Sequence, residues 1–109
     1  MTTFTLQDLE ALIASRATTG SAESSHTRKL LDRGVEHCAK KFGEEAVETV
    51  IAAMQSDDGH FAAECADVIY HLLVLMRAKN LSLDEVTAVL KQRTAMSGLE
   101  EKASRKIAT

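Results

Sequence analysis

The segment from residue 61 to residue 76, FAAECADVIYHLLVLM, decides the fold of this chain. Apolar side chains are so dense in it that a helix built from it has only a thin polar stripe. We therefore predict a core helix over residues 61–76 that is buried on nearly all sides. Four residues form the polar stripe, namely Glu64, Asp67, Tyr70 and His71.

Outward from this segment, helical periodicity predicts four further helices. Apolar residues recur every three or four positions over residues 6–16, 27–54 and 83–97, and a short basic helix is expected over residues 99–107. Gly34 is expected to bend the long 27–54 stretch, whereas Gly43 is only a weak point within it. The predicted helix caps are Thr5 with Asp8, Ser25 or Thr27, Asp58, and Ser82 with Glu85.

The composition favours helices throughout a single domain. The chain has 109 residues, no Pro and few aromatic residues, whereas an all-β fold uses both in its turns and core. This length supports one core but not two. We predict one all-α domain over residues 1–109, with about five helices. Because so short a chain cannot cover a nearly all-apolar helix by itself, we expect a four-helix-bundle core completed by a second copy, and therefore a homodimer.

Charge is distributed unevenly along the chain. Thirteen Lys and Arg residues stand against sixteen Asp and Glu residues, a formal net charge of −3. Residues 42–76 carry seven acids and no Lys or Arg, and basic flanks lie on both sides. No segment combines clustered bases with aromatics, which argues against nucleic-acid binding, and no apolar run approaches the roughly 18 residues of a membrane span. We expect a cytoplasmic protein in which Cys38 and Cys65 are reduced and structural.

Two pairs of carboxylates are the candidate functional residues. Glu45 and Glu48 lie three positions apart, as do Glu64 and Asp67, so each pair shares one face of its helix. No Lys or Arg follows at the spacing needed to pair with the second pair. Two carboxylates about 4 Å apart repel by roughly 4 kcal/mol at an effective dielectric constant of about 20. A divalent cation relieves this repulsion, and all-oxygen ligation favours Mg²⁺, with Mn²⁺ as the alternative.

The same pattern disfavours a di-iron centre. That centre requires Glu-x-x-His on two helices, and here the residue three positions after Glu45 and after Glu64 is another acid. We expect His71 to orient a carboxylate through its ring N–H rather than to bind the cation. Tyr70 is expected to be a core residue.

The sequence KFGEEAVE (residues 41–48), followed by ECADVIYHLLVL (residues 64–75), resembles the EExxE…ExxD signature of the all-α, MazG-like NTP pyrophosphatases. The particular form of both motifs is similar to that of the phosphoribosyl-ATP pyrophosphatases. The resemblance extends over nearly the whole chain. One departure is His26, which stands where this family often has Tyr or Trp.

The resemblance implies Mg²⁺-dependent hydrolysis of the α–β phosphoanhydride of phosphoribosyl-ATP, which yields phosphoribosyl-AMP and pyrophosphate in the second step of histidine biosynthesis. It implies that the cation is held by Glu45, Glu48, Glu64 and Asp67. Glu44 is the candidate to orient or deprotonate the attacking water. The residues expected to contact phosphates are Lys40, Lys41, Arg93, Lys102 and Arg105.

Two other functions fit the same residues. A house-cleaning NTP or dUTP pyrophosphatase of the same superfamily would use the same metal site with a different pocket for the base. A non-catalytic, dimeric helical module would use its acids to bind a structural cation. Assays of pyrophosphate release on a panel of nucleotides distinguish the three.

Overall fold

Five α-helices make up the described part of the chain. The computed structural model describes residues 2–21, 25–95, 98, 102–103 and 105, and these contain no strand. The helices are α1 (Leu6–Thr19), α2 (His26–Asp32), α3 (Val35–Ala53), α4 (Asp58–Ala78) and α5 (Leu83–Thr94). The predicted all-α fold is therefore confirmed. None of the helices in this part of the chain is both long enough and apolar enough to cross a bilayer.

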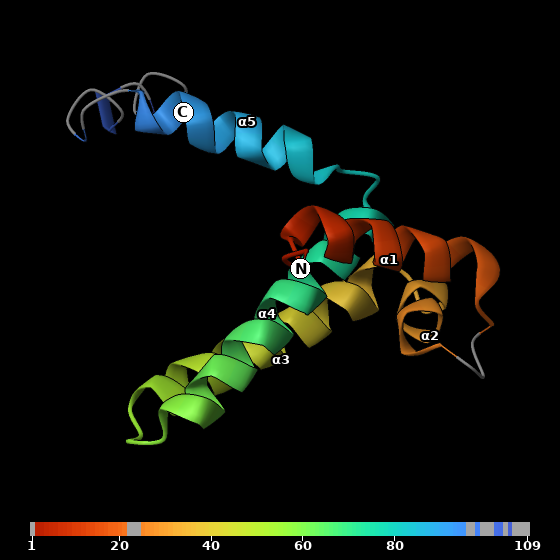
Figure 1. The fold of residues 1–109 in the computed structure, drawn as a ribbon, viewed down its shortest axis with the longest axis horizontal. Helices are drawn as coiled ribbons and strands as arrows, with labels where there is room; N and C mark the ends of the chain where they lie inside the picture. Colours follow the sequence, from red (N-terminus) through yellow and green to blue (C-terminus); the bar gives the residue numbers. More distant parts are fainter. Residues whose placement is uncertain (1, 22–24, 96–97, 99–101, 104, 106–109) are drawn as a thin grey trace.

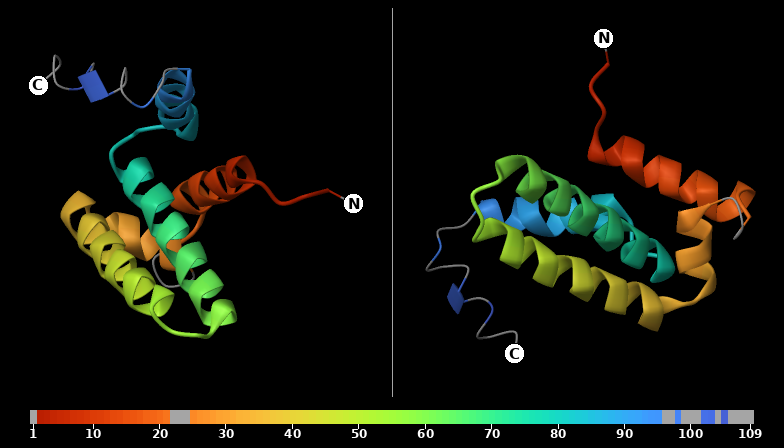
Figure 2. Two further views of the ribbon diagram at one scale, coloured as in Figure 1. Left: turned by 90° about the vertical axis from the view of Figure 1, so that its left-hand side faces the viewer. Right: turned by 90° about the horizontal axis from the view of Figure 1, so that it is seen from below.

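The arrangement is built on an antiparallel hairpin of α3 and α4 (Figure 1). Helices α1 and α2 pack against the end of this hairpin at which α3 begins and α4 ends (Figures 1 and 2). The loop between α3 and α4 lies at the opposite end, and α5 extends away from the other four helices. Among the described helices, α1 and α2 therefore cover one half of the hairpin and leave the other half uncovered.

Side-chain caps begin three of the helices at predicted residues. In each case a hydroxyl oxygen accepts a backbone N–H of the first turn, which has no partner within the helix. Helices α1 and α5 have complete capping boxes, in which the acid at the third helical position also accepts the N–H of the capping residue. The capping residues are Thr5, Ser25 and Ser82.

The predicted cap of α4 is wrong by one residue. The side chain of Asp57 accepts the backbone N–H of His60 at 3.1 Å, and Asp58 is the first residue of the helix. Two adjacent Asp residues have the same capping chemistry, so the sequence pattern cannot choose between them. In its actual position Asp58 places a negative charge in the first turn of α4, where the helix dipole favours it.

Gly34 separates α2 from α3, so the predicted bend is a complete break. Its φ of 91° lies in the region that favours glycine. Helix α3 then continues without interruption through Gly43 to Ala53. The weak point expected at Gly43 thus leaves the helix intact.

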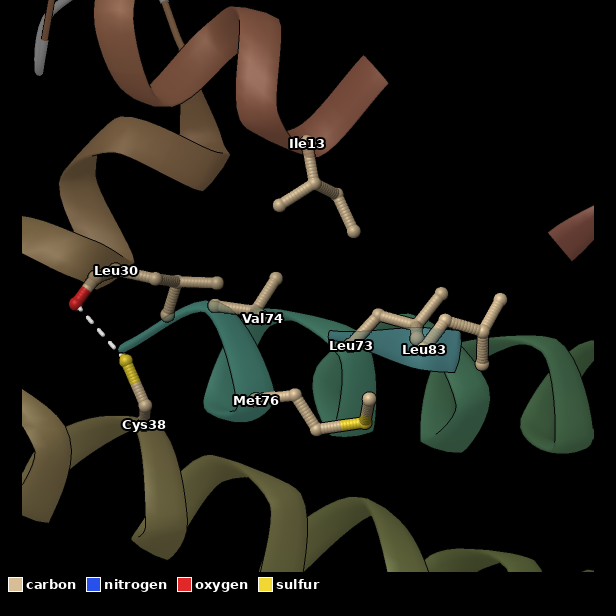
Figure 3. Close-up of a cluster of buried hydrophobic side chains, with 7 residues drawn as sticks. All are labelled: Ile13, Leu30, Cys38, Leu73, Val74, Met76 and Leu83. Carbon is tan, nitrogen blue, oxygen red and sulfur yellow. Dashed lines mark hydrogen bonds between the residues drawn. The ribbon is translucent and has the colours of Figure 1, made fainter. Parts of the chain in front are cut away.

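The buried apolar core lies where α1 and α2 meet the C-terminal half of α4 (Figure 3). The Cys38 thiol donates a hydrogen bond of 3.3 Å to the carbonyl oxygen of Leu30, and burial raises the pKa of this thiol. A hydrogen bond of 2.6 Å between the hydroxyls of Thr27 and Tyr70 ties α2 to α4 beside the core. The core consists of Ile13, Leu30, Cys38, Leu73, Val74, Met76 and Leu83.

The prediction that residues 61–76 are buried on nearly all sides is wrong for the single chain. Ile69 and Leu72 are each 39% exposed, and the buried residues of α4 all lie in its C-terminal half. The physical reason is the position of α1 and α2, which cover only one end of the hairpin. Apolar density in a sequence measures the surface to be buried and does not say which element buries it.

The C-terminal predictions fall partly outside the described residues. Helix α5 ends at Thr94, and residues 96–97, where the prediction ended it, are outside the described part. Of the helix predicted over residues 99–107, residues 99–101, 104 and 106–107 are also outside it. Lys102 and Arg105 are described, both exposed and helical. The single domain over residues 1–109 stays a prediction.

The break at Gly34 leads to a test of backbone strain. Gly34→Ala should lower the free energy of unfolding by about 1–3 kcal/mol, because a side chain is strained at this φ, although the described residues leave open space around it. Gly43→Ala is the matched control: the space there is equally open, and alanine in mid-helix should raise the free energy of unfolding by about 0.5–1 kcal/mol. Urea unfolding followed by circular dichroism measures both. Effects of the same sign would contradict the strain argument.

Candidate metal centre

Three of the four predicted metal ligands lie together across the contact between α3 and α4. One carboxylate oxygen of each of Glu45, Glu48 and Glu64 lies within 4.8 Å of the others. The side chains of Glu45 and Glu64 are only 16% and 14% exposed, whereas Glu48 lies at the exposed rim. Because α3 and α4 are antiparallel, residues far apart in the sequence meet at this one level of the hairpin.

Thr49 fixes the two helices to each other at this level. Its hydroxyl lies 2.8 Å from the carbonyl oxygen of Glu45 and 3.1 Å from that of Glu64, so it can donate to the backbone of either helix. The sequence interpretation did not include this residue. Its spacing of four from Glu45 was the available signal, since a mid-helix Thr often bonds to the carbonyl of the preceding turn.

The electrostatics of the group are unfavourable without a cation. Burial, followed by the charges of Glu48, Asp67 and Glu64, raises the pKa of Glu45. Among the described residues, nothing donates a hydrogen bond to the buried Oε2 of Glu64, and a buried acceptor without a partner is costly. Three facing carboxylates with an unpartnered buried oxygen fit a hard divalent cation such as Mg²⁺.

Two histidines lie beside the buried carboxylates. The Nε2 atom of His71 is 3.9 Å from Oε1 of Glu45, and that of His60 is 3.8 Å from Oε1 of Glu64. Burial, and then the positive charges of His26 and Lys41, lower the pKa of His71, whose side chain is 8% exposed. Both distances exceed that of a direct hydrogen bond. The ring of His71 thus lies beside Glu45 without a hydrogen bond to it, and its predicted role in orienting a carboxylate stays a prediction.

His26, the position that departs from the family pattern, borders the same site. Its exposed ring stacks on Tyr70 with centroids 6.2 Å apart and an interplanar angle of 18°. Its ring is nearly perpendicular to that of His71, at an interplanar angle of 88° and also with a centroid distance of 6.2 Å. The hydroxyl of Tyr70 bonds to the buried Thr27, so this ring cluster is anchored to the start of α2. Tyr70 is half-buried beside the core, which agrees with the role predicted for it.

Asp67 and Glu44 lie outside the group of three. Asp67 is exposed, and its charge contributes to the raised pKa of Glu45, which places it nearby. Glu44 forms an ion pair of 3.1 Å with Lys41. This hydrogen bond and the charge of Lys41 lower the pKa of Glu44.

The five predicted phosphate contacts fall into two sets. Lys41 borders the carboxylates, since its hydrogen bond to Glu44 and the charges of Glu44, Glu45 and Glu48 raise its pKa, and Lys40 is exposed beside it. The second set is not among the described residues that lie at Glu45, Glu48 and Glu64, and α5 itself extends away from the hairpin (Figure 1). That set comprises Arg93, Lys102 and Arg105.

The raised pKa of Glu45 predicts how a neutral substitute changes the stability of the metal-free protein. At pH 7 the ionised carboxylate is penalised in the folded state, so Glu45→Gln should raise Tm by roughly 2–5 °C. The gain should shrink as the pH falls through the raised pKa to the ordinary value, because Glu45 then becomes protonated and neutral in both states. Glu44→Gln is the control of opposite sign, since the pKa of Glu44 is lowered; it should lower Tm slightly or leave it unchanged. Calorimetric scans in chelator between pH 4 and pH 8 measure both, and a Tm gain for Glu45→Gln that is independent of pH would contradict the interpretation.

Comparison with known proteins agrees with the motifs. The sequence matches the family described as phosphoribosyl-ATP pyrophosphohydrolase over residues 6–94. Phosphoribosyl-ATP pyrophosphatase 1 of Rhodopseudomonas palustris is 62% identical over 106 residues, which cover 97% of this chain and 98% of that protein. The protein of the same name from Bradyrhizobium diazoefficiens is also 62% identical over 106 residues, covering 97% and 99%. The phosphoribosyl-ATP pyrophosphatase of Nitrobacter winogradskyi is 57% identical over 105 residues, covering 96% and 90%. The chain therefore belongs to the phosphoribosyl-ATP pyrophosphohydrolase family.

Proposed function

We propose that this chain hydrolyses the α–β phosphoanhydride of phosphoribosyl-ATP and releases phosphoribosyl-AMP and pyrophosphate, the second step of histidine biosynthesis. The observation that carries the proposal is the 62% identity, over almost the full length of both chains, to a protein named for this activity. The facing carboxylates of α3 and α4 supply chemistry suited to it, because a triphosphate substrate requires a cation to offset its charge.

Mg²⁺ is the proposed cofactor, with Mn²⁺ as a substitute. Glu45, Glu48 and Glu64 would hold it through oxygen atoms, and Asp67 is the proposed fourth ligand. The buried, unpartnered oxygen of Glu64 supports this assignment. When bound, the cation supplies positive charge that stabilises the phosphates during hydrolysis.

The remaining side chains have separate roles in this proposal. The hydrogen bond with Lys41 lowers the pKa of Glu44. Glu44 would accept a hydrogen bond or a proton from the water that attacks phosphorus. Lys40 and Lys41 contact the phosphates by charge-assisted hydrogen bonds. His71, buried beside Glu45, restricts the positions that this carboxylate can take.

A homodimer is part of the proposal, because α3 has an apolar face that nothing in the described part of the chain covers. We call this face the α3 apolar stripe; its residues, exposed by 54–83%, are Val47, Val50, Ile51 and Met54. Their spacing places them on the side of α3 opposite Glu45, away from α4. Two hairpins joined through such faces form a four-helix bundle. In this proposal a second copy would also bring Arg93, Lys102 and Arg105 close to the carboxylates of the site.

The α3 apolar stripe predicts the effect of a charge on assembly. Val50→Glu with Ile51→Glu should convert the wild-type dimer to a monomer, because the paired helices would bury four carboxylates without partners. Gln7→Glu, on the exposed side of α1, should leave the dimer unchanged. Sedimentation equilibrium measures the mass of each. A monomeric wild type would contradict the dimer, and an unaffected dimer in the double variant would exclude the stripe as its interface.

A direct assay tests the proposed reaction. The purified protein, freed of metal, should release pyrophosphate from phosphoribosyl-ATP only after Mg²⁺ or Mn²⁺ is added, and a chelator should abolish the release. Preference for dUTP or common NTPs would support the house-cleaning pyrophosphatase instead. No release from any nucleotide would support the non-catalytic module.

Single substitutions in the same assay test the ligand set. Glu48→Gln and Asp67→Asn should each lower kcat/KM by about a hundred-fold or more, because each removes a ligand charge with little change of shape. Asp84→Asn, an exposed acid in the first turn of α5, is the control and should retain wild-type kcat/KM. Wild-type activity in either ligand variant would withdraw that residue from the site, and circular dichroism checks that both variants are folded.

A further inference from the structure

A second charged feature lies at the junction of α2 and α3. A cavity of about 250 Å³ there is lined by Arg33, Glu36, His37 and Lys40. Arg33 is the C-cap of α2, and the other three belong to the first two turns of α3. Three of the four lining residues are basic, and the function proposed above uses only Lys40.

The positive charge of this cavity is not neutralised by the protein. Within the described part of the chain, neither Arg33 nor Lys40 forms an ion pair, in contrast to Lys41, which pairs with Glu44. Partial desolvation, and then the charges of Arg33, Lys41 and Lys40, lower the pKa of His37. Glu36 is the one acid that lines the cavity, so Arg33 and Lys40 leave a net positive charge even with a neutral imidazole.

Of the α3 residues that line the cavity, His37 lies on the same side of the helix as Glu44 and Glu48, whereas Glu36 and Lys40 lie further round it, in the row of the α3 apolar stripe. His37, Lys41, Glu44 and Glu48 follow one another at spacings of four, three and four, which places them along one stripe of the helix. Eight residues separate His37 from Glu45, a distance of roughly 12 Å along the helix axis. A ligand with two anionic groups about this far apart can therefore reach His37 and the carboxylates at once.

We propose that the cavity of Arg33, His37 and Lys40 binds a phosphate monoester, and that in phosphoribosyl-ATP this group is the phosphate of the phosphoribosyl arm. The inference rests on the proposed function. This substrate carries anionic groups at two ends, a triphosphate on one ribose and a phosphate monoester on the other. The carboxylates of α3 and α4 can bind phosphates only through a cation, so the monoester needs bases of its own. The planar guanidinium of Arg33 and the ammonium of Lys40 provide charge-assisted donors, and the N–H of neutral His37 adds a third.

Ribose 5-phosphate, added to metal-free protein, tests the site without catalysis. Without metal the carboxylates repel this probe, so the cavity is the expected place of binding. The imidazole signals of His37 in NMR spectra should shift on titration. Arg33→Ala with Lys40→Ala should weaken the affinity at least tenfold, whereas Glu36→Gln should strengthen it two- to threefold by removing the opposing charge.

The control is a double variant that removes the same number of positive charges from positions outside the cavity. Lys29→Ala with Lys91→Ala also removes two exposed positive charges, neither of which is among the charges that act on His37. It should retain wild-type affinity for ribose 5-phosphate. An equal loss in both double variants would show that only the overall charge matters and would overturn the site. Unmoved His37 signals at saturating probe would overturn it as well.

Kinetics with phosphoribosyl-ATP distinguish binding of its phosphoribosyl phosphate from binding of its triphosphate. They also test the phosphate site separately from the proposed function. In the Arg33 and Lys40 double variant, KM for phosphoribosyl-ATP should rise about tenfold with little change in kcat, because the contact is remote from the bond that breaks. Arg33→Ala alone, which leaves the proposed phosphate contact of Lys40 in place, should not change inhibition by pyrophosphate; a larger loss for pyrophosphate than for ribose 5-phosphate in this variant would overturn the assignment to the phosphoribosyl arm. If the wild type hydrolysed no phosphoribosyl-ATP but still bound ribose 5-phosphate through Arg33 and Lys40, the proposed function would fail while the phosphate site would stand.

Discussion

The repulsion between carboxylates held at the contact of α3 and α4 constrains the rest of the structure. Glu45 and Glu64 are mostly buried there, and the pKa of Glu45 is raised accordingly. The repulsion between these carboxylates therefore disfavours the contact of α3 with α4 at this level. The hydroxyl of Thr49 lies within hydrogen-bond distance of a carbonyl on each helix and stabilises the same contact. The uninterrupted apolar core lies at the other end of the hairpin, beneath α1 and α2 (Figure 3). The apolar core that stabilises the fold and the carboxylates that repel one another thus lie at different levels of the same two helices.

This separation explains why the acids are compatible with a stable fold. A group of like charges is unfavourable in the metal-free protein. Because the two helices hold these acids in place, however, the oxygen ligands are already positioned when a cation binds. Binding then stabilises the folded state by mass action. Surface acids would avoid the repulsion, although they would lose the fixed geometry. His71 and the linked Thr27 and Tyr70 contribute to that geometry by packing beside Glu45 and joining α4 to α2.

Local chemistry was predictable from the sequence, whereas long-range packing was not. The capping boxes of α1 and α5 depend on residues three apart, so the pattern alone identifies Thr5 and Ser82. Helical spacing likewise identified two pairs of carboxylates, Glu45 with Glu48 and Glu64 with Asp67, of which the structure brings Glu45, Glu48 and Glu64 together. The bond between Thr27 and Tyr70 joins residues 43 positions apart, and no spacing rule reaches that far. The exposure of Ile69 and Leu72 was missed for a related reason, because periodicity identifies an apolar face but not the element that covers it.

The charged side chains of α3 change along the helix from bases at its start to carboxylates in its second half, an order that suits an elongated polyanion. Its first turns carry unpaired bases around a cavity, its middle carries the Lys41–Glu44 ion pair, and the carboxylates follow one turn later. A protein can neutralise an anion directly with basic side chains or indirectly through a bound cation. Basic side chains next to the cation site would weaken cation binding, because they repel the cation. The ion pair between them gives Lys41 a partner of its own and limits the positive potential that reaches the carboxylates. A single rigid helix thereby holds both modes at a fixed separation, which a pair of loops could not maintain without further support.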